Sequence, residues 1–463
     1  MLFSSLTFLY LFLPLTLTAY YLAPKKAKNA VLLLASLLFY FYGEPKYTLL
    51  LVFSSLSDWL HALYIENHRT EKGAKRALIS SIVINLLMLG VFKYTDFLIG
   101  TVNTAFGMDI PLTKLPLPIG ISFFTFQTMS YTIDVYRGKA HAQRNLLTLA
   151  TYVCLFPQLV AGPIVRYVDV DAALADPRTS YAQFAYGVRR FALGLGKKIL
   201  IANTLGELHA KLSGAAEASW LGSVFLMIAY TLQIYFDFSG YSDMAIGLGS
   251  MLGFSFPENF NYPFIAKSIT DFWRRWHMTL SGWFRDYLYI PLGGNRVSKG
   301  RWAFNILVVW AATGLWHGAS WNFVLWGAYF GVLLLLEKLF LDQWIARAPR
   351  WIGHAYTLLF VLFSFVIFSN DTLAGIGAQT AALFGGAKWV STEAAYYVKS
   401  YAVVLLAAVV GSTPLLKRGA ERLTVKLPKL AAVSEVVLCT ALLLICTAML
   451  VDSSFNPFLY FRF

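Results

Sequence analysis

The chain has 463 residues, of which 58% are hydrophobic and only 13% are charged. A soluble protein carries about a quarter charged residues, so this composition excludes a soluble enzyme and indicates an all-α, polytopic membrane protein. The formal net charge of +14 comes largely from basic residues in short loops between apolar segments. This distribution follows the positive-inside rule and argues against nucleic acid as a partner.

The N-terminal third begins with three expected spans. The apolar segment 2–22 has no charged residue before it and is followed by a lysine-rich loop, 24–28. A cleaved signal peptide carries its positive charges ahead of its apolar core, so a retained first span is expected. Two further spans are predicted at 30–42 and 47–65, and a second basic loop, 66–76, follows them. If both basic loops are cytoplasmic, the N-terminus lies outside.

The next segments alternate between apolar runs and breaks. Residues 77–106 return outward, and residues 119–133 lead back to a third basic loop, 134–145. The second of these runs carries several polar side chains, so it should face protein or water and not lipid. The span at 146–160 ends in PQLVAGPIVRY (157–167), where prolines and a glycine interrupt it. Broken helices are tolerated where they line a cavity, so this segment is a candidate wall of the site.

Two segments then combine charge with apolar character. Residues 181–212 alternate apolar residues with arginine and lysine, which predicts an amphipathic segment near the cytoplasmic face. The apolar region 220–254 has Asp237 and Asp243 as its only charges. We expect these aspartates to hold the cationic cluster of the next stretch through buried ion pairs, and direct catalysis is the alternative.

The stretch 271–326 concentrates ionisable and aromatic side chains in an otherwise apolar chain. Ionisable groups at membrane depth are costly and usually mark a functional site, so we expect the active centre here. Its two histidines, His277 and His317, form no H-x-x-x-H pair, and no cysteine or glutamate cluster accompanies them. Neither a metal site nor a bound cofactor is therefore expected. An imidazole titrates near neutrality and suits a general base that removes a proton from a hydroxyl.

His317 is the stronger candidate of the two histidines. It stands in LWHGASWNF, where glycine and small residues permit close approach beside large aromatic side chains. Arg274, Arg275 and Arg285 are fixed cations that could bind an anionic donor or stabilise an oxyanion. Cytoplasmic topology anchoring is the alternative for Arg274 and Arg275.

The C-terminal third continues the membrane pattern. Basic loops at 338–350 and 417–429 precede a last expected span at 431–451, and an aromatic tail, 452–463, follows it. Reading the loop charges from either end places both termini outside the cytoplasm. About eleven to thirteen spanning or re-entrant segments are expected, within a single membrane domain over residues 1–463 and with no internal repeat.

Several motifs together resemble a known family. They are FQTMSYTIDVYRG (126–138), PQLVAGPIVRY (157–167), YFDFSGYSDMAIGLG (235–249), ENFNYPF (258–264), DFWRRWHMTLSGWFRDYLYIPLGGNR (271–296) and LWHGASWNFVLWG (315–327). The chain is similar over nearly its whole length to the membrane-bound O-acyltransferases, in the branch that O-acetylates exported polysaccharides such as alginate or peptidoglycan. The resemblance implies a helical fold around a central funnel or channel. It places the family's essential histidine at His317 and its second, less uniform polar position at His277.

The resemblance also implies a function. The chain is expected to move an acetyl group from a cytoplasmic donor, acetyl-CoA, across the bacterial cytoplasmic membrane to a polysaccharide, together with an extracytoplasmic SGNH-type acetyltransferase partner. The residues expected to bind the donor or substrate are Arg274, Arg275, Arg285, Asp237, Asp243, Trp316 and Asn322. Two alternatives remain open: the D-alanylating branch that modifies teichoic acid, and a non-enzymatic exporter or scaffold for polysaccharide synthesis.

The tail, NPFLYFRF, ends the chain with an aromatic cluster that would be an aggregation liability if it were exposed. One interpretation is an interfacial anchor or a strip that docks on the partner protein. The sharper hypothesis is that the tail folds back into the extracytoplasmic mouth, where Tyr460 takes the acetyl group. A phenol can act as a covalent nucleophile. The pKa of the phenol is near 10, so a base such as His317 has to take its proton.

Overall fold

The computed structural model describes residues 1–452, 456 and 459. The described part is mainly helical, and its β-structure is limited to one isolated bridge between Ser219 and Lys388. Six of its helices are long and apolar enough to cross a membrane, or seven if the bent pair 392–400 and 402–411 forms one span. The prediction of an all-α, polytopic membrane protein is confirmed.

Full-length spans are fewer than the expected number of spanning and re-entrant segments, because several apolar segments form short helices. Helices α2 (Lys28–Gly43) and α5 (Ile121–Tyr136) have 16 residues each. At 1.5 Å per residue such a helix is about 24 Å long, less than the ~30 Å hydrocarbon core of a bilayer. The predicted basic loop 417–429 is also largely helical, as α21 (Leu415–Lys426).

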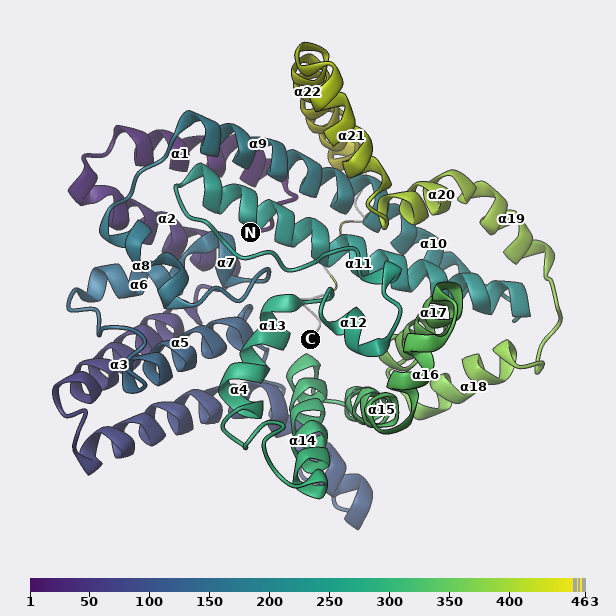
Figure 1. Ribbon diagram of the computed structural model, residues 1–463, viewed down its shortest axis with the longest axis horizontal. Coiled ribbons are helices and arrows are strands. Elements are labelled where there is room, and N and C mark those ends of the chain that lie inside the picture. Colours follow the sequence, from purple (N-terminus) through teal and green to yellow (C-terminus); the bar gives the residue numbers. More distant parts are fainter. Residues whose placement is uncertain (453–455, 457–458, 460–463) are drawn as a thin grey trace. The chain divides into compact units, whose positions relative to one another are not determined.

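The chain forms two compact units, residues 1–191 with 242–258 and residues 192–241 with 259–463. The single membrane domain expected over 1–463 stays a prediction, as does the central funnel. Helices α9 (Tyr181–Gly196) and α11 (Trp220–Met251) each begin in one unit and end in the other. Figure 1 labels the helices.

The first unit contains the N-terminal helices. In chain order they are η1 (Phe8–Phe12), α1 (Leu13–Leu22), η2 (Lys25–Ala27), α2, α3 (Thr48–Asn67), α4 (Lys72–Phe106), α5, α6 (Leu146–Cys154), α7 (Phe156–Leu159) and α8 (Tyr167–Ala175). Helix α5 is almost entirely buried, including Thr125, Gln127 and Ser130. This burial confirms that the polar side chains of 119–133 face protein and not lipid. On α3, buried Asp58 accepts hydrogen bonds from Ser81 and Asn85 of α4, which fastens the two apolar helices together.

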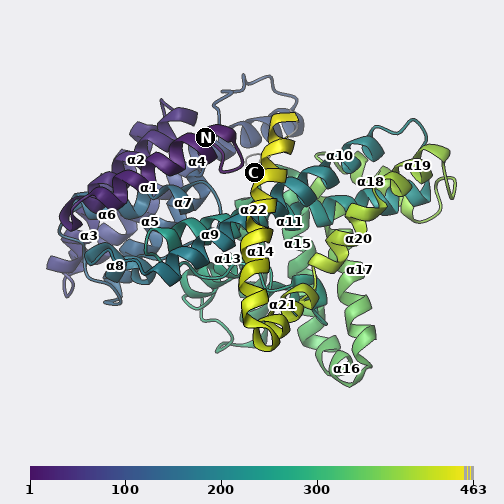
Figure 2. The same cartoon turned by 90° about the horizontal axis from the view of Figure 1, so that it is seen from above.

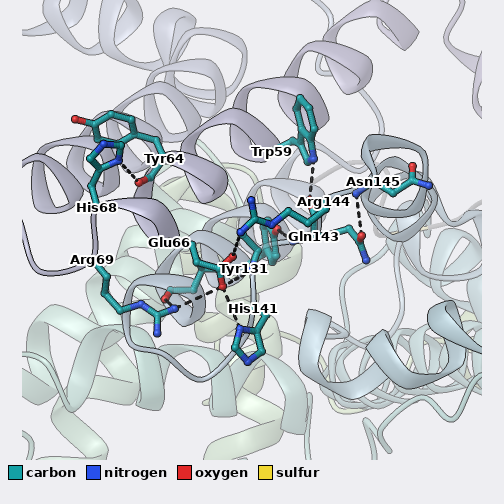
Figure 3. A network of polar contacts seen from close by, with 12 residues as sticks. Trp59, Tyr64, Glu66, His68, Arg69, Tyr131, His141, Gln143, Arg144 and Asn145 are labelled. Carbon is teal, nitrogen blue, oxygen red and sulfur yellow. Dashed lines mark hydrogen bonds and ion pairs between the residues drawn. The ribbon is translucent and has the colours of Figure 1, made fainter.

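Two predicted cytoplasmic loops meet in the first unit. The Glu66 carboxylate lies 3.1 Å from His141 Nδ1 and 3.4 Å from Arg144 Nη2, and it accepts a hydrogen bond from the Ala142 amide (Figure 3). Glu66 belongs to the basic loop 66–76, and its partners belong to the basic loop 134–145. Both loops therefore lie at the same end of this unit, as their charges predict.

The second unit contains the remaining segments. They are η3 (Lys197–Asn203), α10 (Thr204–Ser213), η4 (Pro263–Ile265), α12 (Ile269–Trp273), α13 (Met278–Phe284), η5 (Arg285–Tyr289), α14 (Lys299–His317), α15 (Trp321–Leu336), η6 (Glu337–Leu341), α16 (Asp342–Arg347), α17 (Arg350–Ser369), α18 (Leu373–Leu383), α19 (Thr392–Ser400), α20 (Ala402–Gly411), α21 and α22 (Pro428–Asp452). Helix α22, yellow in Figure 2, is apolar, and Cys446 is its only buried residue. An apolar helix exposed in this way is suited to contact with lipid.

Helices α14 and α15 pack closely through two glycines. A Cβ added to Gly314 would lie 2.4 Å from the Phe323 carbonyl oxygen, and one added to Gly327 would lie 2.5 Å from the Trp310 carbonyl oxygen. Small residues at a helix crossing let the two backbones approach, a common device in membrane helices. The crossing lies one turn before the end of α14, so it fixes the position of that helix end.

Candidate active site

His317 is the last residue of α14, and only 2% of its surface is exposed. The chain leaves the helix in an extended conformation at Gly318. A Cβ added to Gly318 would lie 2.1 Å from the ring of Phe323, so only glycine fits there. The expectation that glycine permits close approach to aromatic side chains beside His317 is confirmed.

Three aromatic rings enclose His317. Its ring centroid lies 5.1 Å from Trp316, 4.9 Å from Trp326 and 5.5 Å from Phe368, each nearly edge-on. These side chains come from α14, α15 and α17. Large apolar rings exclude water, and electrostatic effects and proton transfers are stronger in such surroundings.

His277 lies between α12 and α13, is completely buried, and contacts the same tryptophan. Its ring centroid lies 5.7 Å from Trp316 and 4.7 Å from Phe238 of α11. The structure thus brings together the two histidines that the sequence analysis singled out. Burial lowers the pKa of the His277 imidazole well below its usual value, and a positive charge on His317 lowers that pKa further. His277 is therefore neutral near pH 7.

Asn259 is a site residue that the sequence analysis missed. Its side chain is completely buried, and its Oδ1 lies 3.1 Å from His277 Nδ1. The same oxygen accepts a hydrogen bond of 2.9 Å from the Thr279 hydroxyl. The motif ENFNYPF contains Asn259, but nothing in the motif itself indicates that a segment 18 residues later receives its side chain.

Glu337 is a second missed residue and supports the segment before His277. It is completely buried at the start of η6, and its carboxylate accepts hydrogen bonds from the backbone amides of Ile269 (2.6 Å) and Thr270 (2.9 Å). These amides open α12, whose N-terminus has no partners within the helix and favours a negative charge. Glu337 thus ties α12 to the end of α15.

Asp237 forms a buried ion pair, but with a different partner from the one expected. Its Oδ1 lies 2.6 Å from Lys198 Nζ, and its Oδ2 accepts a hydrogen bond of 2.9 Å from the Leu459 amide. The ion-pair interpretation holds, whereas the arginines of the central stretch are not its cations. Lys198 belongs to η3, a π-helical turn whose extra residue turns this lysine inward. The amphipathic pattern of 181–212 predicts basic side chains at the surface, so it could not show that Lys198 is buried.

Asp243 belongs to the other compact unit. Its carboxylate pairs with Arg190 at 2.7 Å, and Arg190 also pairs with Glu258 at 2.6 Å. Asp243 therefore also holds a cation, but from α9 and not from the central stretch. Its role in donor binding stays a prediction.

The three arginines expected to bind the donor lie at or near the surface. Arg274 and Arg285 are exposed, and Arg285 pairs with Asp286 at 2.7 Å. Arg275 is half-buried and pairs with Asp271 at 2.9 Å. None of them is among the rings around His317, and their contact with a donor stays a prediction.

Trp316 and Asn322 are close to His317 in the structure. Trp316 contacts both histidines, as described above. Asn322 is buried, donates a hydrogen bond of 3.2 Å to the Phe368 carbonyl oxygen and accepts one from the Ser320 hydroxyl. Asn322 therefore holds Phe368 against His317. Contact of either residue with substrate stays a prediction.

Two other expectations concern the tail and metals. Tyr460 lies outside the described residues; the tail positions the structure describes are Asp452, Asn456 and Leu459. Within residues 1–452, 456 and 459, no three His, Cys, Asp or Glu side chains gather as a metal-binding group. The catalytic roles expected for His277, His317 and Tyr460 stay predictions.

The chain is similar to known proteins over most of its length. The family model described as "MBOAT, membrane-bound O-acyltransferase family" matches residues 88–377. The chain is 42% identical over 403 residues to "Probable alginate O-acetylase AlgI" of Pseudomonas aeruginosa, which covers 85% of this chain and 76% of that protein. It is 35% identical over 411 residues to "Peptidoglycan O-acetyltransferase" of Helicobacter pylori, covering 81% of this chain and 78% of that protein.

A more distant relative has a different activity. The chain is 32% identical over 272 residues to "Teichoic acid D-alanyltransferase" of Bacillus subtilis, covering 54% of this chain and 68% of that protein. His277, His317 and Asn259 all lie within the region that the family model matches.

Proposed function

Because this chain belongs to the membrane-bound O-acyltransferase family and is a membrane acyltransferase, we propose that it moves an acetyl group from cytoplasmic acetyl-CoA to an exported polysaccharide. The single observation that carries the proposal is the burial of His277 and His317 against one shared tryptophan. The relatives named for alginate and peptidoglycan support an alginate-like polymer or peptidoglycan as the acceptor.

His317 acts as the general base in this proposal. A hydroxyl nucleophile gives its proton to the imidazole while its oxygen attacks the thioester carbonyl carbon. A carbon–oxygen bond forms, the carbon–sulfur bond breaks, and the proton passes from the imidazolium to the departing thiolate. The aromatic enclosure excludes the water that would otherwise hydrolyse the thioester. The exposed Arg274 and Arg285 suit the phosphates of a CoA donor.

The tail supplies the nucleophile in the sharper form of the proposal. Leu459, which immediately precedes Tyr460, donates its backbone amide to buried Asp237. Asp237 is followed by Phe238, whose ring contacts His277. Tyr460 would accept the acetyl group as an aryl ester, and an extracytoplasmic SGNH-type partner would take it onward to the polymer. An aryl ester suits this relay because the phenolate is a good leaving group.

The rival acyl group is D-alanine, which the similarity to a teichoic acid D-alanyltransferase favours. A deletion strain separates the readings. We expect polysaccharide O-acetyl esters to disappear from its envelope, by mass analysis of isolated glycans, while the amount of exported polymer and of ester-linked D-alanine stays at the wild-type level. Loss of D-alanine esters alone would favour the rival, and loss of the polymer itself would favour an exporter or scaffold.

We propose a location in the bacterial cytoplasmic membrane with both termini outside, from the charges of the loops. Cysteines replacing Lys72 and Gly419 should then be protected from an impermeant thiol reagent added to intact cells, whereas one replacing Asp109 should react. All three positions are exposed on the protein, so protection would come from the membrane barrier.

The unsubstituted chain is the control for that labelling, because Cys439 is only partly buried. Labelling of the Lys72 and Gly419 positions with protection of the Asp109 position would reverse the orientation. Permeabilised cells should label at every one of the three positions.

A further inference from the structure

The buried side chain of Asn259 meets the turn that carries His277. Its Oδ1 lies 3.1 Å from His277 Nδ1, 2.9 Å from the Thr279 hydroxyl and 3.4 Å from the Thr279 backbone nitrogen. A backbone N–H can only donate a hydrogen bond, so the Asn259 atom that faces it must be the amide oxygen and not the amide nitrogen. An oxygen at this position can only accept from the histidine ring.

We propose that Asn259 is a positioning residue that fixes the tautomer of His277, with the proton on Nδ1 and the lone pair on Nε2. In a neutral imidazole one nitrogen donates and the other accepts, so the partner of Nδ1 decides the chemistry of Nε2. Nε2 is thereby the basic atom of His277. It can accept a hydrogen bond from a hydroxyl, a thiol or a water molecule.

The backbone of the same segment holds the turn from its other side. Met278 donates its amide to the Asn259 carbonyl oxygen at 3.0 Å, and Asn261 donates its amide to the Arg275 carbonyl oxygen at 2.9 Å. His277 itself has φ 43°, a left-handed conformation that is strained for a non-glycine residue. The segment 259–261 stabilises this strained turn, and such strain persists only where the surroundings enforce it.

The charged and titratable groups around His277 come from several elements. They are His317 on α14, Arg274 and Arg275 just before His277, and Asp237 with Lys198 beside Phe238 on α11. Because two neighbouring imidazoles disfavour each other's charge, at most one of His277 and His317 is protonated near neutrality. A neutral His277 with basic Nε2 leaves His317 free to take the proton.

The first test is independent of any enzymatic activity. Full-length chain in lipid nanodiscs, with ¹⁵N-labelled histidine, is compared with Asn259→Leu and Asn259→Asp, and the His277 signals are assigned by their absence in His277→Gln. We expect a protonated Nδ1 and an unprotonated Nε2 in the wild type at pH 7, and loss of this pattern in Asn259→Leu. A wild-type ring protonated on Nε2, or a pattern unchanged in Asn259→Leu, would overturn the proposal.

The second test uses activity and rests on the proposed function. Asn259→Asp keeps the size and the acceptor oxygen, so it is the variant least able to disturb folding. Its carboxylate should favour the imidazolium form and raise the pKa of His277. The acid limb of the pH profile for thiol release from acetyl-CoA should then move upward by about 1–3 pH units, the usual effect of an adjacent opposite charge. Asn259→Leu should lower kcat by at least ~10-fold, because a wrong tautomer disables a catalytic imidazole.

Asn261→Asp is the matched control, since it makes the same chemical change two residues along at an exposed position. It changes only the side chain and keeps the backbone amide that binds the Arg275 carbonyl oxygen, so it should leave the pH profile in place. An unshifted profile in Asn259→Asp, with wild-type kcat in Asn259→Leu, would refute the positioning role. If His277→Gln instead retains full activity while the nitrogen spectra behave as expected, the tautomer assignment stands and His277 has no part in the transfer.

Discussion

Replacing His317 with alanine is expected to lower acetyl transfer by about 10²–10⁴-fold, the usual contribution of a general base. The reason is that His317 ends α14 inside three aromatic rings, where water cannot take its place as a base. Its buried ring is also bordered by glycine, so the truncated variant should keep the helix crossing. The measurement is thiol release from acetyl-CoA by purified chain, at matched protein level and thermal stability.

His209→Ala is a suitable control for that loss. His209 lies in the same unit on α10, 5.1 Å from the ring of Tyr230, and has no part in the proposed chemistry. Activity close to wild type is expected there. If His317→Ala retained transfer comparable to the His209 variant, His317 would not be the base, and the aromatic enclosure would have only a packing role.

Replacing Tyr460 with phenylalanine is expected to abolish polymer acetylation, because it removes the one hydroxyl that the relay requires and nothing else. Two described residues of the tail form hydrogen bonds with distant residues of the chain. Asn456 Oδ1 accepts a hydrogen bond from Asn203 Nδ2 at 3.2 Å, and the Leu459 amide donates one to Asp237. Both contacts precede Tyr460 in the chain and should persist in the variant. The measurement is O-acetyl ester on isolated polysaccharide, together with acetyl on the C-terminal peptide by mass spectrometry.

Tyr460→Ala gives the comparison, since it removes both the hydroxyl and the aromatic ring. Inactivity of both variants, with an acetylated tyrosine peptide in the wild type, is the result that the relay predicts. Full activity of Tyr460→Phe with an inactive Tyr460→Ala would reject the relay and leave the tail as an aromatic anchor.

The helical membrane fold and the two candidate histidines, His277 and His317, could be predicted from local sequence. Apolar runs of the right length predict helices, and the motif around His317 already contains the glycine and aromatic residues that enclose it. Burial of the polar face of α5 was also predictable, because polar residues inside an apolar run must face protein. The number of full membrane spans was not predictable, because several apolar runs form helices too short to cross a bilayer.

The supporting residues were not predictable because their partners are distant in sequence. Glu337 caps a helix that begins 68 residues earlier, and Lys198 pairs with an aspartate on a different helix. Local charge patterns place both side chains at a surface. The π-helical turns η3 and η6 add a residue to a helical turn and re-aim these side chains, and ordinary helical periodicity has no signal for that insertion.

The arginines illustrate the same limit from the other direction. Arg274 is exposed although it is only three residues from a completely buried histidine. Between them the chain leaves α12 and enters the left-handed turn at His277, so neither a helical nor an extended period relates the two positions. The density of charged residues indicated the correct stretch, 271–326. It could not show which of its side chains are buried and which lie at the surface.

The central claim is that this chain uses a buried histidine to withdraw an acetyl group from acetyl-CoA. Its most direct test is to incubate purified chain in lipid nanodiscs with acetyl-CoA labelled in the acetyl group, and to count free CoA and label transferred to protein. The account predicts CoA release with label on the wild-type chain, and neither above the blank for His317→Ala. Equal release by the wild type and His317→Ala would contradict it. A wild-type chain that does not react with acetyl-CoA but accepts D-alanine from a carrier protein would also contradict it.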